Sequence, residues 1–426
     1  MDYQTGRLGV RLSGRPYRSA WLRNPMVRRP TWVFFEFQEA DDSTMSNHES
    51  TSTRDAVGRS DSKSEKYPTT GVIQTLGMDV VHEHSEGSLR VQIPRLADYV
   101  ARREQAPLSL HPAWPLVLAE GLGHIPYCLE TQRGGQTTGL LPLCSVNGPI
   151  FGRFLVGLPY LNYGGVLADS KEAERLLIDR AVELAERIDA RYLELRHAGS
   201  GVDHAALTHR VDHKLHMKLS LPKTVEALWD ELPAKVRNQV RKAQKGDLTL
   251  IWGGEDLLAE FHAVFSKNMR DLGTPSYGVG LFRAILRNFP DRAELCVVRS
   301  SGRPAAAAML LHGLGITEVP SASSLKELNY TNANMLMYWN LLMRATQRGQ
   351  SAFDFGRSSR DSGTYRFKAQ WGAEPRPSAW QYRLRRGGLK DARPDNPRYR
   401  RMIRLWQRLP LSLTRLIGPL IVRGIP

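Results

Sequence analysis

Two strand-like stretches, a helix and a further strand follow one another in the first half of the chain. Residues 127–130 and 139–146 read as paired strands around a glycine-containing turn. Residues 172–189 carry apolar side chains at helical spacing, and the short apolar run 192–195 is typical of a returning strand. This order predicts a mixed α/β unit, because strands and helices that follow one another pack as a sheet covered by helices.

The second half repeats this order with different residues. We expect strands at 216–219, 248–252, 295–299, 305–312, 318–323 and 352–355, and helices at 224–231, 234–245, 257–272 and 334–348. In the first half we also expect a strand at 89–93 and a helix at 114–121. The sequence therefore predicts two tandem α/β units, at residues 88–212 and 213–390.

Both ends of the chain differ from these units in composition. Residues 1–87 are rich in Arg and Pro or in Ser, Thr and Asp, and too few of them are apolar to form a core, so we expect a disordered extension. Residues 391–426 carry apolar side chains at broadly helical spacing among arginines. We expect Pro410 and Pro419 to divide this tail into short helical pieces.

The positive charge of the chain is concentrated near its carboxyl end. Residues 383–426 contain twelve Lys or Arg and two Asp, a net charge of +10 out of +16 for the whole chain. Such a segment favours contact with a polyanion, either an anionic membrane surface or RNA. The alternatives are a solvated tail without a partner and a helix docked on the second unit. No feature suggests DNA as a partner.

Composition favours a cytoplasmic protein. Apolar residues make up 41% and charged residues 24% of the chain, and no window approaches the roughly 18 apolar residues of a membrane span. The amino terminus does not have the pattern of a secretory signal. The cysteines are Cys128, Cys144 and Cys296; each lies in an apolar stretch, so we expect buried thiols rather than disulfides. The alternative location is peripheral, at the inner face of the cytoplasmic membrane.

A basic helix is the first candidate for substrate binding. Between Pro233 and Gly246, Arg237 and Arg241 are four residues apart and share one face, and Lys242 adds charge without a local acidic partner. The planar guanidinium groups of arginines can each bind two phosphate oxygens. We expect this helix to bind a phosphate-bearing substrate; a solvated face that pairs with carboxylates elsewhere is the alternative.

The segment 353–375 is the candidate reaction centre, because a strand there leads into a loop rich in Ser and Gly. Lys368 lies among aromatic residues and could stabilise the oxyanion that develops when an amine attacks an acyl carbonyl. It could equally bind a phosphate or pair with Glu374. The candidate residues around it have different roles: Asp354 and Tyr365 as bases, Phe367 beside the lysine, and Arg357, Ser358, Trp371 and the first-unit Tyr163 as substrate-binding residues.

Several common signatures are missing from the sequence. The acetyl-coenzyme A pattern Arg/Gln-x-x-Gly-x-Gly/Ala has only incomplete matches, at 303–308 and 360–365. Nucleophile-elbow, Walker and dinucleotide-binding motifs are also missing. His82 and His84 are a weak metal signal in a polar segment. We expect no metal and no permanently bound cofactor.

The motifs Phe-Asp-Phe-Gly-Arg-Ser at 353–358 and Phe-Lys-x-x-Trp-Gly-Ala-Glu-Pro at 367–375, together with the arginine-rich helix, make the chain resemble the FemAB-like proteins associated with the exosortase/PEP-CTERM system. The resemblance extends from about residue 90 to the carboxyl terminus. It implies tandem GNAT-like domains and transfer of an acyl or aminoacyl group. In the Fem pattern a Phe-Lys pair lies at the transfer site, and Phe367-Lys368 matches it.

The resemblance implies an acyltransferase that acts on an amino group of a cell-envelope or exopolysaccharide precursor. Its donor substrate would be aminoacyl-tRNA or acyl-coenzyme A, so tRNA is one expected partner. The alternative is a protein without catalytic activity that binds membrane or RNA through the basic helix and tail.

Overall fold

The structure, a computed structural model, describes residues 78–148, 151–386 and 400–425. Most of the expected amino-terminal extension and part of the tail lie outside these ranges. Residues 80–84, which were expected to belong to this extension, form a strand. The expected strand at 89–93 is wrong: these residues belong to a helix that buries Leu89 and Leu96. In so short a stretch the apolar residues fit both the two-residue period of a strand and the 3.6-residue period of a helix, and packing against the sheet favoured the helix.

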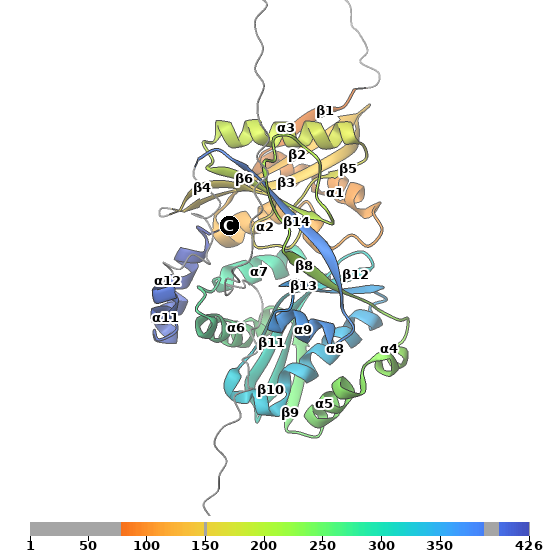
Figure 1. The fold of residues 1–426 in the computed structure, drawn as a ribbon, viewed down its shortest axis with the longest axis vertical. Helices are drawn as coiled ribbons and strands as arrows, with labels where there is room; N and C mark the ends of the chain where they lie inside the picture. Colours follow the sequence, from red (N-terminus) through yellow and green to blue (C-terminus); the bar gives the residue numbers. More distant parts are fainter. Residues whose placement is uncertain (1–77, 149–150, 387–399, 426) are drawn as a thin grey trace, which may run out of the picture. The chain divides into compact units, whose positions relative to one another are not determined.

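The first unit consists of strands that pair mostly antiparallel, and of helices that lie between them in the chain. Its helices are α1 (Glu86–Ala101), the 3₁₀ turn η1 (Leu108–Leu110), α2 (Trp114–Leu122) and α3 (Lys171–Arg187), and its strands are β1 (Val80–His84), β2 (Ile125–Arg133), β3 (Gln136–Gly148), β4 (Gly152–Val156), β5 (Leu167–Ala168), β6 (Tyr192–Ala198) and β7 (His209–Val211). Gly134 and Gly135, both at positive φ, make the tight turn between β2 and β3. Figure 1 shows α3 lying along this part of the sheet.

The second unit repeats the arrangement. Its strands are β8 (Lys214–Ser220), β9 (Leu248–Gly253), β10 (Ala293–Ser300), β11 (Arg303–His312), β12 (Ile316–Ser324), β13 (Ala352–Ser359) and β14 (Glu374–Leu384). Its helices are α4 (Val225–Glu231), α5 (Ala234–Gln244), α6 (Leu258–Leu272), α7 (Val279–Asn288), α8 (Ala333–Gln347) and α9 (Gly363–Ala369), with 3₁₀ turns η2 (Glu255–Leu257) and η3 (Lys326–Thr331). The sequence analysis did not predict α7, which begins directly after Gly278 and contains Gly280, a residue that disfavours a helix interior.

The tandem arrangement is confirmed by the strand pairing. In the first unit β2, β3 and β4 are antiparallel, α3 follows, and β6 returns parallel to β4. In the second unit β10, β11 and β12 are antiparallel, α8 follows, and β13 returns parallel to β12. Each parallel pair is joined by only two or three residue pairs and then separates. The mixed α/β fold class is therefore confirmed.

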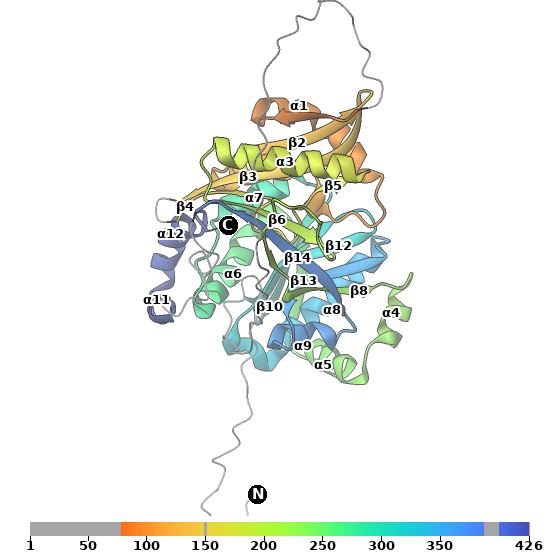
Figure 2. The same cartoon turned by 45° about the horizontal axis from the view of Figure 1, so that its top comes forward.

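One strand joins the two units into a single sheet. Within the described residues the strand order is β1-β2-β3-β4-β6-β14-β8-β13-β12-β11-β10-β9. Strand β14 is the last strand of the second unit, yet it pairs antiparallel with β6 of the first unit and also with β8. Figures 1 and 2 show β14 crossing from one unit to the other. The predicted boundary between residues 212 and 213 therefore separates β6 from β14, although these two strands share backbone hydrogen bonds.

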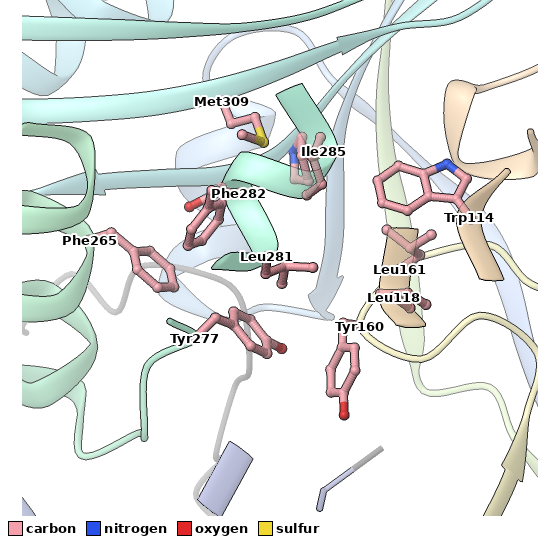
Figure 3. A pocket seen from close by; sticks show the side chains of 12 residues that line it. Trp114, Leu118, Tyr160, Leu161, Phe265, Tyr277, Leu281, Phe282, Ile285 and Met309 are labelled. Atoms are coloured by element: carbon pink, nitrogen blue, oxygen red, sulfur yellow. The ribbon is translucent and has the colours of Figure 1, made fainter. Parts of the chain in front are cut away.

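The two units also share a hydrophobic core. Trp114 and Leu118 from the first unit pack in one cluster with Phe261, Phe282 and Met309 from the second. Figure 3 shows a small apolar pocket within this core, where side chains of α2 face those of α6 and α7. Its volume is about 40 Å³.

We predict that Trp114→Ala destabilises both units together. Trp114 is fully buried, its ring lies 5.1 Å from that of Phe289, and its Nε1 donates a hydrogen bond to the carbonyl of Leu108. Loss of such a side chain costs about 3–5 kcal/mol of unfolding free energy. Urea denaturation followed by circular dichroism measures this. Tyr330→Ala is the control, because Tyr330 is 74% exposed; equal losses for the two variants would contradict the prediction.

The carboxyl-terminal segment forms α11 (Arg400–Trp406) and α12 (Leu411–Val422). Pro410 precedes α12 as expected, but Pro419 lies inside it, so the second expected break is wrong. Both helices lie against α6 in Figures 1 and 2. Val422 is buried in the shared core, and Arg415 Nε donates a hydrogen bond to Ser266 Oγ at 2.8 Å. Of the alternatives for the tail, the docked helix is therefore present.

Candidate transfer site between the two units

A buried polar cluster forms where the first unit meets the second. Tyr163, from the loop before β5, donates a hydrogen bond from its hydroxyl group to Asp354 Oδ2 on β13 at 2.5 Å. The ring of Tyr163 stacks on that of His216 on β8, with centroids 4.4 Å apart. His216 Nδ1 lies 3.5 Å from the same carboxylate oxygen. All three side chains are at most 2% exposed.

Local backbone structure places Asp354 in this cluster. Phe353 and Phe355 pack in the second-unit core, so Asp354 between them points to the opposite face of the sheet. The strand is irregular just beyond, where Gly356 has φ 76° and its N–H donates to Asp354 Oδ1 at 2.7 Å. A side chain at this position would be strained and would approach Asn162 of the first-unit loop, so the glycine lets the two segments meet.

Asp354 and His216 differ in charge at neutral pH: the carboxyl group is ionised and the imidazole is neutral. Burial favours the neutral form of Asp354, but His216, Lys218 and the hydrogen bond from Tyr163 outweigh it and lower its pKa to about 2. Burial lowers the pKa of His216 below its ordinary value, against the opposing effect of Asp354. At neutral pH the site therefore combines a carboxylate with a neutral imidazole. Groups whose pKa values are separated in this way are typical of acid–base sites.

The imidazole faces a cavity of about 390 Å³. The cavity is lined by Gln105, Tyr163, Ala198, Gly199, His216, Lys218, Leu219, Ser220, Ala352, Arg376 and Pro377. Among the described residues His216 Nε2 has no hydrogen-bond partner, although it is buried. A buried ring nitrogen without a partner is costly unless a ligand satisfies it. Lys218 and Arg376 make the cavity suitable for a substrate that carries a negative charge near its reacting group.

A second carboxylate lies beside the cluster. Glu318 on β12 is paired in register with Asp354 and accepts hydrogen bonds from the N–H (2.9 Å) and the hydroxyl group (2.6 Å) of Ser109 in the first unit. Burial, followed by the charge of Asp354, raises the pKa of Glu318 to about 7. Two adjacent buried carboxyl groups do not both ionise readily, so Asp354 carries the charge and Glu318 holds a proton.

We predict that Glu318→Gln changes how stability depends on pH. Between pH 4.5, its ordinary pKa, and about 7, folded Glu318 keeps a proton that the unfolded chain releases. Its contribution to stability is therefore present below pH 4.5 and is lost as the pH rises to 7, by about 3 kcal/mol. Gln keeps the contacts with Ser109 without this loss, so the variant gains stability relative to wild type over this range.

Urea denaturation at both ends of the range measures the difference. Glu172→Gln is the control, since the Glu172 side chain is 59% exposed. A difference between Glu318→Gln and wild type that does not change with pH would contradict the prediction.

Lys368 lies on the opposite face of β13 from Asp354. It is 1% exposed and comes from α9, which packs on the second-unit core. Its Nζ donates hydrogen bonds to the carbonyls of Gly356 at 3.2 Å and Arg357 at 2.8 Å. Lys368 therefore holds the irregular part of β13 that positions Asp354. The segment expected to be a loop is mostly ordered as β13 and α9.

The remaining candidate residues of 353–375 fall into two groups. Phe367, Tyr365 and Trp371 pack on the second-unit core, where the rings of Phe367 and Trp371 contact that of Tyr338, so they support α9. Arg357 lies over the ring of Trp380, 3.4 Å from its centroid, and Ser358 is 1% exposed on β13. These residues do not line the cavity.

The basic helix α5 presents two different faces. Arg237 donates to the carbonyl of Asp230, and Arg241 lies over the ring of Trp229, so both arginines turn toward α4. Lys242 lies on another face, where an open groove runs to the residue before α8. The groove is lined by Lys235, Asn238, Gln239, Lys242 and Asn332. Two lysines beside a helix amino end form an environment that favours phosphate.

Sequence reasoning named Tyr163 and Asp354, which the fold brings together, and missed His216, Lys218 and Glu318. The sequence does contain a pattern that indicates His216 and Lys218. They alternate with Met217 and Leu219 on β8, which places both polar residues on one face of the strand. His84 lies elsewhere, 2.9 Å from Glu130. Within the described part of the chain no cluster of His, Cys, Asp and Glu could hold a metal ion, and no helix is long and apolar enough to cross a membrane.

Comparisons with solved structures show limited overall similarity. FemX is 14% identical, with a TM-score of 0.49 over 67% of this chain and 93% of that one. The carboxyl-terminal domain of a putative lysylphosphatidylglycerol synthetase from Agrobacterium fabrum is 12% identical, with a TM-score of 0.48 over 72% and 94% of the two chains. A tandem GNAT protein from the clavulanic acid biosynthesis pathway is 13% identical, with a TM-score of 0.47 over 72% and 100%.

A search of curated proteins found no match. The comparison with protein families matches residues 233–369 to the acetyltransferase (GNAT) domain. This segment begins at α5, ends at the end of α9, and contains Glu318, Asp354 and Lys368. The GNAT-like character that the sequence suggested is therefore confirmed for the main part of the second unit, where residues 233–369 are similar to the GNAT acetyltransferase domain.

Proposed function

We propose that the protein is an N-acyltransferase that transfers an acyl or aminoacyl group to an amino group of a cell-envelope or exopolysaccharide precursor. The GNAT domain supports acyl transfer as the reaction class. The observation that carries the proposal is His216: a buried imidazole beside a carboxylate, which lines a cavity and whose Nε2 has no hydrogen-bond partner among the described residues.

In the proposed reaction the amine nitrogen of the acceptor attacks the carbonyl carbon of a thioester or ester. His216 Nε2 accepts the N–H proton as the C–N bond forms, and the charge of Asp354 stabilises the resulting imidazolium. The tetrahedral intermediate then collapses as its C–S or C–O bond breaks, and the leaving thiolate or ribose oxygen of a tRNA takes the proton from the His216 imidazolium. Tyr163 keeps Asp354 in place through its hydrogen bond and His216 through stacking.

The charges around the cavity support an acceptor with an anionic group close to its amine. Lys218 and Arg376 both line the cavity, and Lys218 Nζ lies 5.3 Å from the ring centroid of Tyr163. A carboxylate or phosphate held there would place the neighbouring amine near His216. Precursors of cell-envelope polymers commonly combine amines with phosphates or carboxylates.

The groove at α5 supports a donor that carries phosphates. Lys235 and Lys242, with the amino end of α8, offer positive charge on one side of the second unit. Both acyl-coenzyme A, the donor of the GNAT family, and aminoacyl-tRNA carry the phosphates that such a groove would bind.

Transfer itself is the direct test. The full chain is incubated with amine acceptors and either acyl-coenzyme A or aminoacyl-tRNA, and acylated products are identified by mass spectrometry. We expect an N-acylated product with one donor, and sensitivity to RNase identifies tRNA as that donor. A protein that binds phosphates or membranes but gives no product with either donor would overturn the proposal in favour of a binding protein without catalytic activity.

A further inference from the structure

The docked carboxyl-terminal helices leave one face uncovered, and this face is apolar. Met402 and Leu405 on α11 are 61% and 62% exposed. On α12, Leu413, Leu416 and Leu420 are 39%, 71% and 59% exposed. These five side chains, here called the apolar face, account for half of the large hydrophobic residues that are exposed in the described part of the chain.

Helical spacing places the exposed leucines of α12 together on one side of the helix. Leu413, Leu416 and Leu420 are three and four residues apart and share one side of α12. Thr414, Gly418 and Val422 are buried and lie on the side that faces the rest of the protein. At 100° per residue the two sets are on roughly opposite sides of the helix. The helix therefore has one apolar side against the protein and a second that faces outward.

The charges within the segment that forms α11 and α12 are all positive. Residues 400–425 contain six arginines and no Asp or Glu. Arg401 is exposed on α11 beside Met402, Arg408 is exposed just after this helix, and Arg423 is exposed at the end of α12. Exposed leucines bordered by arginines are the arrangement of helices that lie in the headgroup region of an anionic bilayer.

This charge also argues against the other occupants. A second copy of the chain, related by a twofold axis, would place two sets of arginines against each other. RNA would bind the arginines but would leave the exposed leucines uncovered. We propose that the apolar face of α11 and α12 rests on an anionic lipid bilayer, with the leucines inserted among the acyl chains and the arginines on the lipid phosphates. This inference does not depend on the proposed transfer reaction.

Anchoring of this kind has a structural consequence for the site. Residues 422 and 423 contact Tyr160, whose hydroxyl group donates to the carbonyl of Arg423 at 3.2 Å. Tyr160 belongs to the same first-unit loop as Tyr163. A membrane-bound tail is thus attached directly to the loop that lines the cavity, which would keep the cavity near acceptors embedded in the membrane.

Vesicle flotation of the full chain tests the proposal. We expect binding to vesicles of phosphatidylcholine with phosphatidylglycerol and little binding to phosphatidylcholine alone. Leu405→Asp with Leu416→Asp should lower the partition coefficient at least about tenfold, because each change removes a leucine that inserts among the acyl chains and adds a negative charge. Val91→Asp with Ile125→Asp is the matched control, since these residues are 74% and 51% exposed on the first unit.

Three results would overturn the proposal: no binding of wild type to anionic vesicles, equal loss of binding in the control pair, or unchanged binding of the Leu405/Leu416 variant. A wild-type dimer that the Leu405/Leu416 substitutions dissociate, measured by analytical ultracentrifugation, would assign the face to a second copy instead. Competition by RNA that removes all vesicle binding of wild type at physiological salt would assign the arginines to nucleic acid. Circular dichroism confirms that the variants are folded.

Discussion

Replacement of His216 by Asn should lower the rate of transfer by about 10²–10⁴-fold, which is the usual contribution of a general base. Asn is smaller than His and polar, so it keeps a polar group beside Asp354 but offers no basic nitrogen. Its effect should appear in kcat rather than in the KM of the donor, which binds elsewhere under the proposed function. Steady-state kinetics of product formation measures both.

His84→Asn is the matched control for this substitution. His84 also contacts a buried carboxylate, Glu130, but it lies on β1 at the far end of the sheet. Turnover of the control should remain near that of wild type. If His216→Asn is folded and retains normal turnover, the assignment of His216 as the base is wrong.

The pH dependence of wild type provides a second readout of the same residue. The pKa of His216 is below 6.5, so the imidazole is neutral and able to accept a proton at pH 7. Activity should therefore be constant through neutral pH and fall as the pH decreases through the lowered pKa. An acidic limb that persists unchanged in His216→Asn would assign it to another group.

Lys368→Met should reduce turnover at least about tenfold and also reduce stability. The ammonium group is buried and bonded to the carbonyls of Gly356 and Arg357, and its removal leaves those two carbonyls without a charged donor at a cost of roughly 1–3 kcal/mol. The irregular strand there holds Asp354, so a shift of this strand would separate Asp354 from Tyr163 and His216.

Two measurements distinguish the roles proposed for Lys368. If it stabilises an oxyanion, as the resemblance implies, kcat falls while the urea midpoint stays near that of wild type. If it supports β13, both fall together, and Lys368→Arg restores part of each. Arg366→Met on the exposed side of the same helix is the control and should change neither. Normal activity in Lys368→Met would contradict both roles.

Much of the fold could be predicted from local pattern. The helices α3, α6 and α8 and the strands from β10 to β12 have long, regular periods, and their positions agree with the expected ranges within a few residues. The errors occurred where the pattern was short or interrupted. Residues 89–93 form part of a helix, and α7, which begins directly after Gly278, was not predicted.

The candidate site was predicted less completely, because its members are distant in sequence. Tyr163 and Asp354 were chosen separately, for their positions in a loop and at a strand, and are 191 residues apart. No local pattern indicates that they share a hydrogen bond. The resemblance drew attention to Lys368, whereas the cavity is lined by His216 and Lys218 from β8, for which the sequence predicted a strand at 216–219 and no functional residue.

By itself the sequence determined the periods of the elements, the repeated α/β order and the concentration of charge in the tail, since each depends on neighbouring residues. Only the tertiary structure decided which polar groups meet, because register and the pairing of β14 with both units set those contacts. It also decided that the lysines of α5 rather than Arg237 and Arg241 line the groove, and that the tail is docked with a second apolar side exposed. These features depend on which face of each element is covered by another, and that is set by contacts between segments far apart in the chain.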